Sequence, residues 1–250
     1  MTSLKSQTFV CIDCETTGLD PKKDHIIEVA IATFTLEAIV EEFETLINPK
    51  ASIPKESINV HHITEEMVQG QPAIEEILPQ ILKMAGNLPV IGHGILFDID
   101  ILESHAKRHN IPCTLKNNLQ FDTLRLARLY GRSPSNSLET LRQHFNILAE
   151  GAHRAMSDVV VNIQVFKKLL SDFKTLEQIQ EVLSKPIMMK NMPLGKHKGR
   201  PFKELPLNYL HWAANQDFDR DLLYSLRSEL ARRKKGNTFS QAVNPFLSQL

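Results

Sequence analysis

The chain has 250 residues, of which 42% are hydrophobic and 23% are charged, and its formal net charge is zero at pH 7. This composition is typical of a globular protein, and the length allows one large domain or one domain with a small module. We expect no membrane partner, because the sequence has no run of about 18 uncharged apolar residues. The first ten residues lack the apolar segment of a signal peptide, and we predict a strand over residues 9–15.

The three cysteines, Cys11, Cys14 and Cys113, do not form the even, regularly spaced set of a disulfide framework. They suit a reducing compartment, so we expect a cytoplasmic protein. Cys11 and Cys14 have the C-x-x-C spacing of zinc and redox sites, but no second Cys or His pair has a matching spacing. We therefore predict that both thiols are buried packing groups.

Charge is distributed unevenly along the sequence. Residues 191–250 hold 10 Lys and Arg against 5 Asp and Glu, whereas residues 1–190 hold 19 against 24. A basic segment indicates an anionic partner, and a solvated charged face is the alternative.

The first third of the chain alternates strand patterns with turn residues. Residues 8–15 are mostly apolar, residues 16–24 contain turn-forming residues, and residues 25–48 have the pattern of two further strands. Residues 64–84 have apolar positions at helical spacing and acidic residues near their start, which predicts a helix. We predict a short buried strand over residues 88–93.

The remaining core is mostly helical in pattern. We predict a helix with an Asn or Ser cap over 136–147, a helix that Ser157 caps over 157–173, and two more helices over 97–111 and 120–130. Strands followed by mixed strands and helices predict an α/β fold, a mixed sheet flanked by helices. The predicted divisions are a core at 8–174, a linker at 175–190, a small helical module at 191–235 and a flexible tail at 236–250.

Asp13 and Glu15 lie at the end of the first predicted strand. Positions i and i+2 of a strand share a face, so both carboxylates project together. Two neighbouring carboxylates repel each other unless a cation or proton lies between them, and hard ions such as Mg²⁺ or Mn²⁺ suit them. The alternative is a pair of exposed acids at a strand end.

Three more residues follow apolar runs or precede helices. Asp98 and Asp158 each fall in the first turn of a predicted helix, where an acid also interacts favourably with the helix dipole. His153 precedes Asp158 by five residues and has the side chain best suited to proton transfer at neutral pH. Taken singly, each of the three also has a purely structural explanation.

Together these segments resemble a known family. D-x-E-T-T-G-L at 13–19, H-x-x-x-F-D at 93–98 and H-R-A-x-x-D at 153–158 are similar to the three exonuclease motifs of the DnaQ-like DEDD superfamily. The third motif resembles that of the branch that uses histidine, and V-H-H-I-T at 60–64 resembles another family segment. The resemblance covers roughly residues 8–170.

The resemblance implies an RNase H-like fold and metal-dependent 3′→5′ exonuclease activity. By this similarity, Asp13, Glu15 and Asp158 would hold one Mg²⁺ or Mn²⁺, and Asp13 with Asp98 would hold a second. Two such ions stabilise the attacking and leaving oxygens of an in-line displacement. His153 would take a proton from the attacking water.

The same resemblance predicts contacts with the terminal nucleotide of the substrate. Thr16 and Leu19 match substrate-contacting positions of the family, and Phe97 is a further candidate. The second motif departs from the usual H-N-x-x-F-D, because Gly94 stands in place of Asn. We expect Gly94 to alter the affinity for the strand without removing a metal ligand.

The C-terminal module resembles the one that follows the nuclease core in the exodeoxyribonuclease X family. Four basic residues flank a Gly-rich turn and are candidates for DNA contact: Lys196, Lys198, Arg200 and Lys203. Basic groups of this kind contact phosphates and raise affinity without reading sequence. Tyr209 and Trp212 lie nearby in sequence, and the alternative is that both form the core of the module while the lysines are only solvated.

The leading hypothesis is a DNA 3′→5′ exonuclease that releases nucleoside 5′-monophosphates in repair or end trimming, with single-stranded DNA or the 3′ ends of duplex DNA as partner. One alternative is a proofreading subunit that binds a DNA polymerase, or a sliding clamp through residues 241–247. Another is an RNA 3′ exonuclease. A non-catalytic nucleic-acid-binding protein is a further class, but it predicts a lost carboxylate or histidine, and all five positions are filled.

Overall fold

The computed structural model describes residues 4–148 and 154–242, with side chains described up to residue 235. The chain divides into two compact units, Met1–Leu183 (unit 1) and Ser184–Leu250 (unit 2), and each is described by itself. In the described part of the chain, every helix is too short or too polar to cross a membrane.

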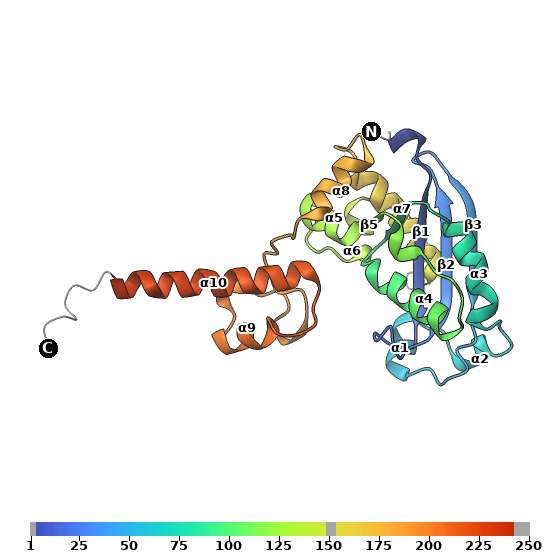
Figure 1. Cartoon of the computed structure of the whole chain (residues 1–250), viewed down its shortest axis with the longest axis horizontal. Helices are drawn as coiled ribbons and strands as arrows, with labels where there is room; N and C mark the ends of the chain where they lie inside the picture. The colour runs from blue at the N-terminus through green and yellow to red at the C-terminus, as the bar shows by residue number, and fades with distance from the viewer. Residues whose placement is uncertain (1–3, 149–153, 243–250) are drawn as a thin grey trace, which may run out of the picture. The chain divides into compact units, whose positions relative to one another are not determined.

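A five-stranded mixed sheet lies at the centre of unit 1 (Figure 1). Its strands have the order β3-β2-β1-β4-β5. The first three strands, β1 (Phe9–Thr16), β2 (Ile26–Phe34) and β3 (Ile39–Leu46), pair antiparallel because short turns join them. β4 (Val90–Gly92) and β5 (Gln120–Asp122) are parallel to β1, because helices make the crossovers between them. The mixed α/β sheet predicted from the sequence is confirmed.

Side chains of β1 alternate between two hydrophobic cores. Phe9 and Cys11 belong to the core on one face, whereas Val10 and Ile12 belong to the core on the other. The helices of the first core are α5 (Thr123–Tyr130), α6 (Leu138–His144), α7 (Ala155–Leu169) and α8 (Leu176–Ser184). The second core contains residues of α3 (Ile74–Ala85) and α4 (Leu96–Arg108).

A third, smaller cluster includes Ile27 of β2 together with Ile53, Ile63 and Val68. It lies around two short helices, α1 (Lys55–His61) and α2 (Glu65–Val68), of which α1 was not predicted. Short single turns complete unit 1 at η1 (Leu4–Ser6) and η2 (Leu115–Asn117).

Two segments that were predicted to be single helices each contain two elements. The helix predicted over 64–84 is two helices, α2 and α3, because Gly70 adopts a positive φ of 79° and Pro72 follows it. The helix predicted over 120–130 begins only at Thr123, because residues 120–122 pair with β4 as strand β5. Asp122 then caps α5, since its carboxylate accepts the backbone N–H of Leu124 at 2.8 Å.

Helix α7 begins two residues before the predicted start. Ser157 lies inside the first turn and is not the cap, which is Arg154 without a side-chain cap bond. The N–H of Ala155 instead donates to the carboxylate of Glu28 on β2, at 3.0 Å. A distant strand therefore satisfies a donor that a local cap satisfies in most helices.

The cysteines of the C-x-x-C sequence have the buried positions that we predicted. Cys11 and Cys14 are buried free thiols that belong to different cores, one on each face of the sheet. Burial raises the pKa of both thiols, as expected of packing groups in apolar surroundings. They do not form a paired site.

Unit 2 has its own hydrophobic core, which includes Phe202, Tyr209, Leu210 and Leu222. Its elements are η3 (Gly195–His197), η4 (Phe202–Glu204), α9 (Leu207–Ala213) and α10 (Arg220–Ala242). The backbone of the preceding segment is fixed to α10, because Ile187 N–H donates to the buried carboxylate of Asp221 at 3.0 Å. Helix α10 continues through residues 236–242, which we had predicted to be part of a flexible tail.

Candidate active site

Three carboxylates from two elements meet at one end of the sheet. Asp13 and Glu15 lie on β1, and Asp158 lies in the first turn of α7, which packs on the same face as the odd-numbered residues of β1. One carboxylate oxygen of each residue lies within 4.8 Å of the others, and all three side chains are half-buried. The structure thus brings together residues 143 to 145 positions apart in the sequence.

Several negative charges lie close together in this cluster. Burial, and then the neighbouring carboxylates Asp98, Asp158 and Glu15, raise the pKa of Asp13 well above its usual range. Burial and the charge of Asp158 also raise the pKa of Glu15 to about 7. Raised carboxylate pKa values in a cluster are typical of a functional site, because the charges are held together against their repulsion.

A divalent cation fits this donor set. It would offset the repulsion among the three carboxylates, and hard carboxylate oxygens are the ligands that Mg²⁺ and Mn²⁺ prefer. Among the described residues, Asp13, Glu15 and Asp158 are the one group whose side chains could meet around a metal ion. The geometry therefore suits the cation site predicted from the sequence.

Asp98 approaches the cluster from the other face of the sheet. It is buried in the first turn of α4, and its Oδ1 accepts the backbone N–H of Cys14 at 3.0 Å. That N–H is free for the contact because the pairing of β1 with β4 ends before it, at Cys11 and Ile91. Burial raises the pKa of Asp98 to about 8, although the bond from Cys14 acts in the opposite direction.

His153 lies outside the described residues, so its position relative to the three carboxylates stays a prediction. The adjacent Arg154 is described. Its guanidinium pairs with Glu28, with Nη2 2.6 Å from Oε1. The chain on the C-terminal side of His153 is therefore anchored to strand β2.

Glu28 is a buried acid next to the site that the sequence analysis missed. It is buried to 1% exposure, lies opposite Glu15 in the β1–β2 register, and holds both Arg154 and the N–H of Ala155. The signal was present in the sequence, because Glu28 is a lone acid in an otherwise apolar strand. A buried acid needs a partner, and no local residue supplies one.

The predicted substrate-contacting residues differ in exposure. Leu19 is 88% exposed in the turn after β1, which leaves its side chain available to pack on a ligand. Thr16 is buried, and its hydroxyl donates to the carbonyl of Gly18 at 2.7 Å, so it also shapes that turn. Phe97 is half-buried and packs against the core that contains α4.

The second motif is built around the backbone of Gly94. Its φ of 82° lies in the left-handed region, and its N–H donates to Asp122 at 3.0 Å. Asn is among the residues that tolerate this conformation, so the backbone here suits both Gly94 and the Asn that the family resemblance led us to expect.

His93 of the same motif has a structural role in this conformation. Its Nε2 lies 2.9 Å from the carbonyl oxygen of Asn136, and its Nδ1 lies 3.0 Å from the hydroxyl of Thr123. Because a carbonyl only accepts, Nε2 carries a proton. Burial lowers the pKa of His93 to about 4, so the ring is neutral at pH 7 and Nδ1 is an acceptor.

Two family models match different parts of the chain. Residues 10–166 match the family model described as "Exonuclease". Residues 180–230 match a second model, described as "Putative quorum-sensing-regulated virulence factor".

Two kinds of relative illustrate the sequence similarity. The chain is 33% identical to DNA polymerase III subunit epsilon of Aquifex aeolicus over 171 residues, which cover 68% of this chain and 84% of that subunit. It is also 33% identical to the PolC-type DNA polymerase III of Clostridium perfringens over 193 residues. That match covers 74% of this chain but only 13% of the polymerase.

Solved structures share the fold. Exonuclease X in complex with 5′ overhanging duplex DNA has a TM-score of 0.56 and 24% identity, covering 70% of this chain and 98% of that one. E. coli exonuclease I in complex with a dA16 oligonucleotide has a TM-score of 0.62 and 18% identity, covering 72% and 43%. The RNase H-like fold and the DnaQ-like resemblance predicted from the motifs are confirmed, and the chain belongs to the exonuclease family.

Proposed function

We propose that the protein is a 3′→5′ exodeoxyribonuclease, which removes nucleoside 5′-monophosphates from the 3′ end of DNA. The observation that carries the proposal is the meeting of Asp13, Glu15 and Asp158 within 4.8 Å at the end of β1. Family membership and the 33% identity with a polymerase III epsilon subunit support the same reaction.

In this proposal Asp13, Glu15 and Asp158 would hold one divalent cation, and Asp13 and Asp98 would help to hold a second. Bound ions of this kind supply positive charge to the attacking and leaving oxygens of an in-line displacement at phosphorus. Asp98 is pre-oriented for its role because Cys14 N–H fixes one of its carboxylate oxygens. Burial, and after it the neighbouring carboxylates, raise the pKa values of Asp13 and Asp98. These shifts support cation binding, since a cation offsets both the burial of the charges and their repulsion.

His153 takes the proton of the attacking water in this mechanism. Its ordinary pKa of about 6.5 suits a general base at neutral pH. The residue that follows His153 in the sequence, Arg154, forms an ion pair with Glu28. Leu19, exposed beside the carboxylate-bearing strand end, packs on the terminal base.

The experiment that tests this function is degradation of 5′-labelled oligonucleotides by the full chain. Matched DNA and RNA, single- and double-stranded, are incubated with Mg²⁺ or with EDTA, and Asp158→Ala serves as the inactive control. A metal-dependent ladder that shortens DNA from its 3′ end supports the proposal. A ladder on RNA alone reassigns the substrate, and the absence of any ladder contradicts nuclease function.

A second candidate is a proofreading subunit of a DNA polymerase, which the similarity to epsilon favours because it covers 84% of that subunit. Proofreading predicts faster removal of a mismatched than of a paired 3′ nucleotide from duplex DNA. Equal rates on both termini argue for general end trimming instead.

A further inference from the structure

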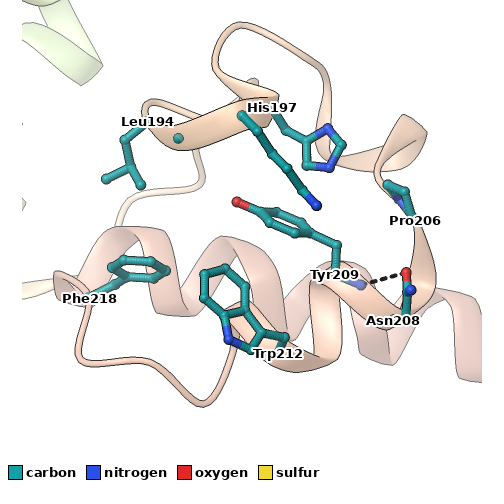
Figure 2. Close-up of a pocket in the computed structure, with 9 residues that line it drawn as sticks. Leu194, His197, Pro206, Asn208, Tyr209, Trp212 and Phe218 are labelled. Atoms are coloured by element: carbon teal, nitrogen blue, oxygen red, sulfur yellow. Dashed lines mark hydrogen bonds between the residues drawn. The ribbon is translucent and has the colours of Figure 1, made fainter.

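A pocket of about 660 Å³ is lined entirely by residues of unit 2 (Figure 2). One wall is the first part of the module, including Leu194, Lys196 and His197, and another is the start of α9. Trp212 and Phe218 close the apolar side, as Figure 2 shows.

Two aromatic residues of this pocket, Tyr209 and Trp212, differ in exposure. Tyr209 is 9% exposed and belongs to the core, where its ring lies 5.3 Å from that of Trp212. Trp212 is 53% exposed and is not part of that core. Burying a large indole is strongly favourable, so a half-exposed Trp beside a pocket indicates a surface that another planar group can cover.

One lysine lines the same pocket, and three more basic residues follow it in the sequence. The ammonium of Lys196 lies 5.5 Å from the centre of the Tyr209 ring, and the His197 ring packs against that ring edge-on at 4.4 Å. Lys198 and Arg200 follow in the same turn, and Lys203 lies just beyond. Within the described part of the chain, none of these four basic side chains forms an ion pair with a carboxylate, so their charge is available to an anion.

The exposed indole of Trp212 and the nearby ammonium of Lys196 suit a ligand that has both a planar ring and a negative charge. In such a ligand a sugar separates the ring from the charge. A nucleotide in a single strand has this chemistry, whereas a base-paired nucleotide has no free ring face to offer. We propose that the pocket of unit 2 binds an unpaired nucleotide of single-stranded nucleic acid. Its base stacks on Trp212, and its phosphate contacts Lys196.

This inference goes beyond the nuclease reaction, because it assigns a second nucleic-acid site to a unit that holds none of the proposed catalytic residues. Trp212 is the only tryptophan of the chain, so its fluorescence reports on this pocket alone.

The test uses the full chain carrying Asp158→Ala in EDTA, so that the probe strand stays intact. A fluorescein-labelled single-stranded oligonucleotide of mixed sequence reports total binding by anisotropy, and the unlabelled strand is titrated against tryptophan emission.

The expected result is quenching of Trp212 emission as the strand binds. Trp212→Ala should weaken binding about 10-fold, since stacking of one base on an aromatic side chain contributes that much or more. Tyr224→Ala is the matched control, because Tyr224 is 41% exposed on α10 but does not line the pocket. It should leave both affinity and quenching unchanged.

Lys196→Ala should reduce the slope of log affinity against log salt by about 0.7, the contribution of one phosphate contact on a single strand. Lys190→Ala removes the same charge from unit 2 outside the pocket and should leave the slope unchanged. Thermal unfolding of each variant shows whether unit 2 keeps its fold. If Trp212→Ala does not keep the fold, Trp212→Phe replaces it in the test. Trp212→Phe retains an aromatic ring and should recover most of the affinity.

Saturated anisotropy without any change in Trp212 emission would overturn the proposal. The proposal would also be overturned if an acidic peptide with an aromatic end quenched Trp212 emission and the oligonucleotide did not. The partner of the pocket would then be a protein. The two proposals fail separately. A DNA ladder from the wild-type chain without quenching rejects only the pocket, and quenching without a ladder rejects only the nuclease.

Discussion

Glu28 and Arg154 form a bidentate ion pair between strand β2 and the start of α7, with Nη2 2.6 Å from Oε1 and Nε 3.2 Å from Oε2. The side chain of Glu28 is 2% exposed, whereas that of Arg154 is 45% exposed. The pair joins the residue next to His153 to the strand beside Asp13 and Glu15. It therefore couples the third motif to the first.

Glu28→Gln should lower the free energy of unfolding by about 1–3 kcal/mol, because it removes hydrogen bonds to a charged group at a buried position. Turnover should fall as well, since the start of α7, which carries Asp158, loses its anchor. Chemical unfolding and single-turnover cleavage measure the two effects. Glu139→Gln breaks the more exposed pair with Arg142 and should change stability by less than about 1 kcal/mol. Equal effects of both variants on turnover would argue against positioning by Glu28.

His153→Ala should reduce turnover by about 10²–10⁴, the usual contribution of a general base. The loss should appear in kcat rather than KM, because the proton transfer occurs in the reaction and not in substrate binding. Steady-state kinetics over a range of pH measures it. A variant that retains the wild-type pH–rate profile would show that another group takes the proton.

Asp13→Asn should remove the effect of metal on stability. At a Mg²⁺ concentration about 100-fold above Kd, the wild type should gain about 2.7 kcal/mol over the EDTA form, because a ligand that binds only the folded state stabilises it. In EDTA, Asp13→Asn should be at least as stable as the wild type, since it relieves repulsion within the cluster. Thermal unfolding with and without Mg²⁺ tests both points.

Glu42→Gln provides the control for Asp13→Asn, because Glu42 is an exposed acid on β3 away from the cluster. It should keep the full response to Mg²⁺. If Mg²⁺ still stabilised Asp13→Asn but no longer stabilised Glu42→Gln, the cation would bind outside the cluster of Asp13, Glu15 and Asp158.

His105→Gln should flatten the acid side of the stability profile. His105 is buried on α4, and burial, followed by the charge of Arg108 and the neighbouring His25 and His109, lowers its pKa to about 4. The unfolded chain, with a His pKa of about 6.5, binds a proton that the folded chain does not. Stability due to neutral His105 is therefore complete above pH 6.5 and is lost as the pH falls toward 4.

Urea unfolding between pH 7 and pH 4 measures this slope for the wild type and for His105→Gln. His144→Gln is the matched control, because His144 is exposed on α6. Identical slopes for the wild type and His105→Gln would show that His105 is not a source of acid destabilisation.

Gly94→Asn should be tolerated better than Gly94→Val. A Cβ at Gly94 has room, since the nearest atom it meets is Leu124 Cδ2 at 4.0 Å, so the φ of 82° decides the outcome. Asn adopts this region more readily than other residues with a side chain, whereas β-branched residues are strained there. We expect Gly94→Val to lose about 1–2 kcal/mol more than Gly94→Asn by urea unfolding. Equal losses would show that backbone strain does not limit the choice at this position.

Sequence alone determined the features that depend on local order. The alternation of β1 placed Asp13 and Glu15 on one face, and the apolar run before Asp98 placed it at the start of a helix. These features are readable because strand and helix periods fix which side chains share a face. The motif order then identified the family before any contact was known.

Only the tertiary structure decided the features that depend on residues far apart in sequence. The start of α7 is set by Glu28, which lies 127 residues before Ala155, and the strand character of 120–122 is set by pairing with β4. The division between buried Tyr209 and half-exposed Trp212 likewise follows from how unit 2 packs. Local propensity does not determine these outcomes. A buried charge, a short parallel strand and a packed aromatic ring are each stabilised by contacts with residues that only the fold brings close.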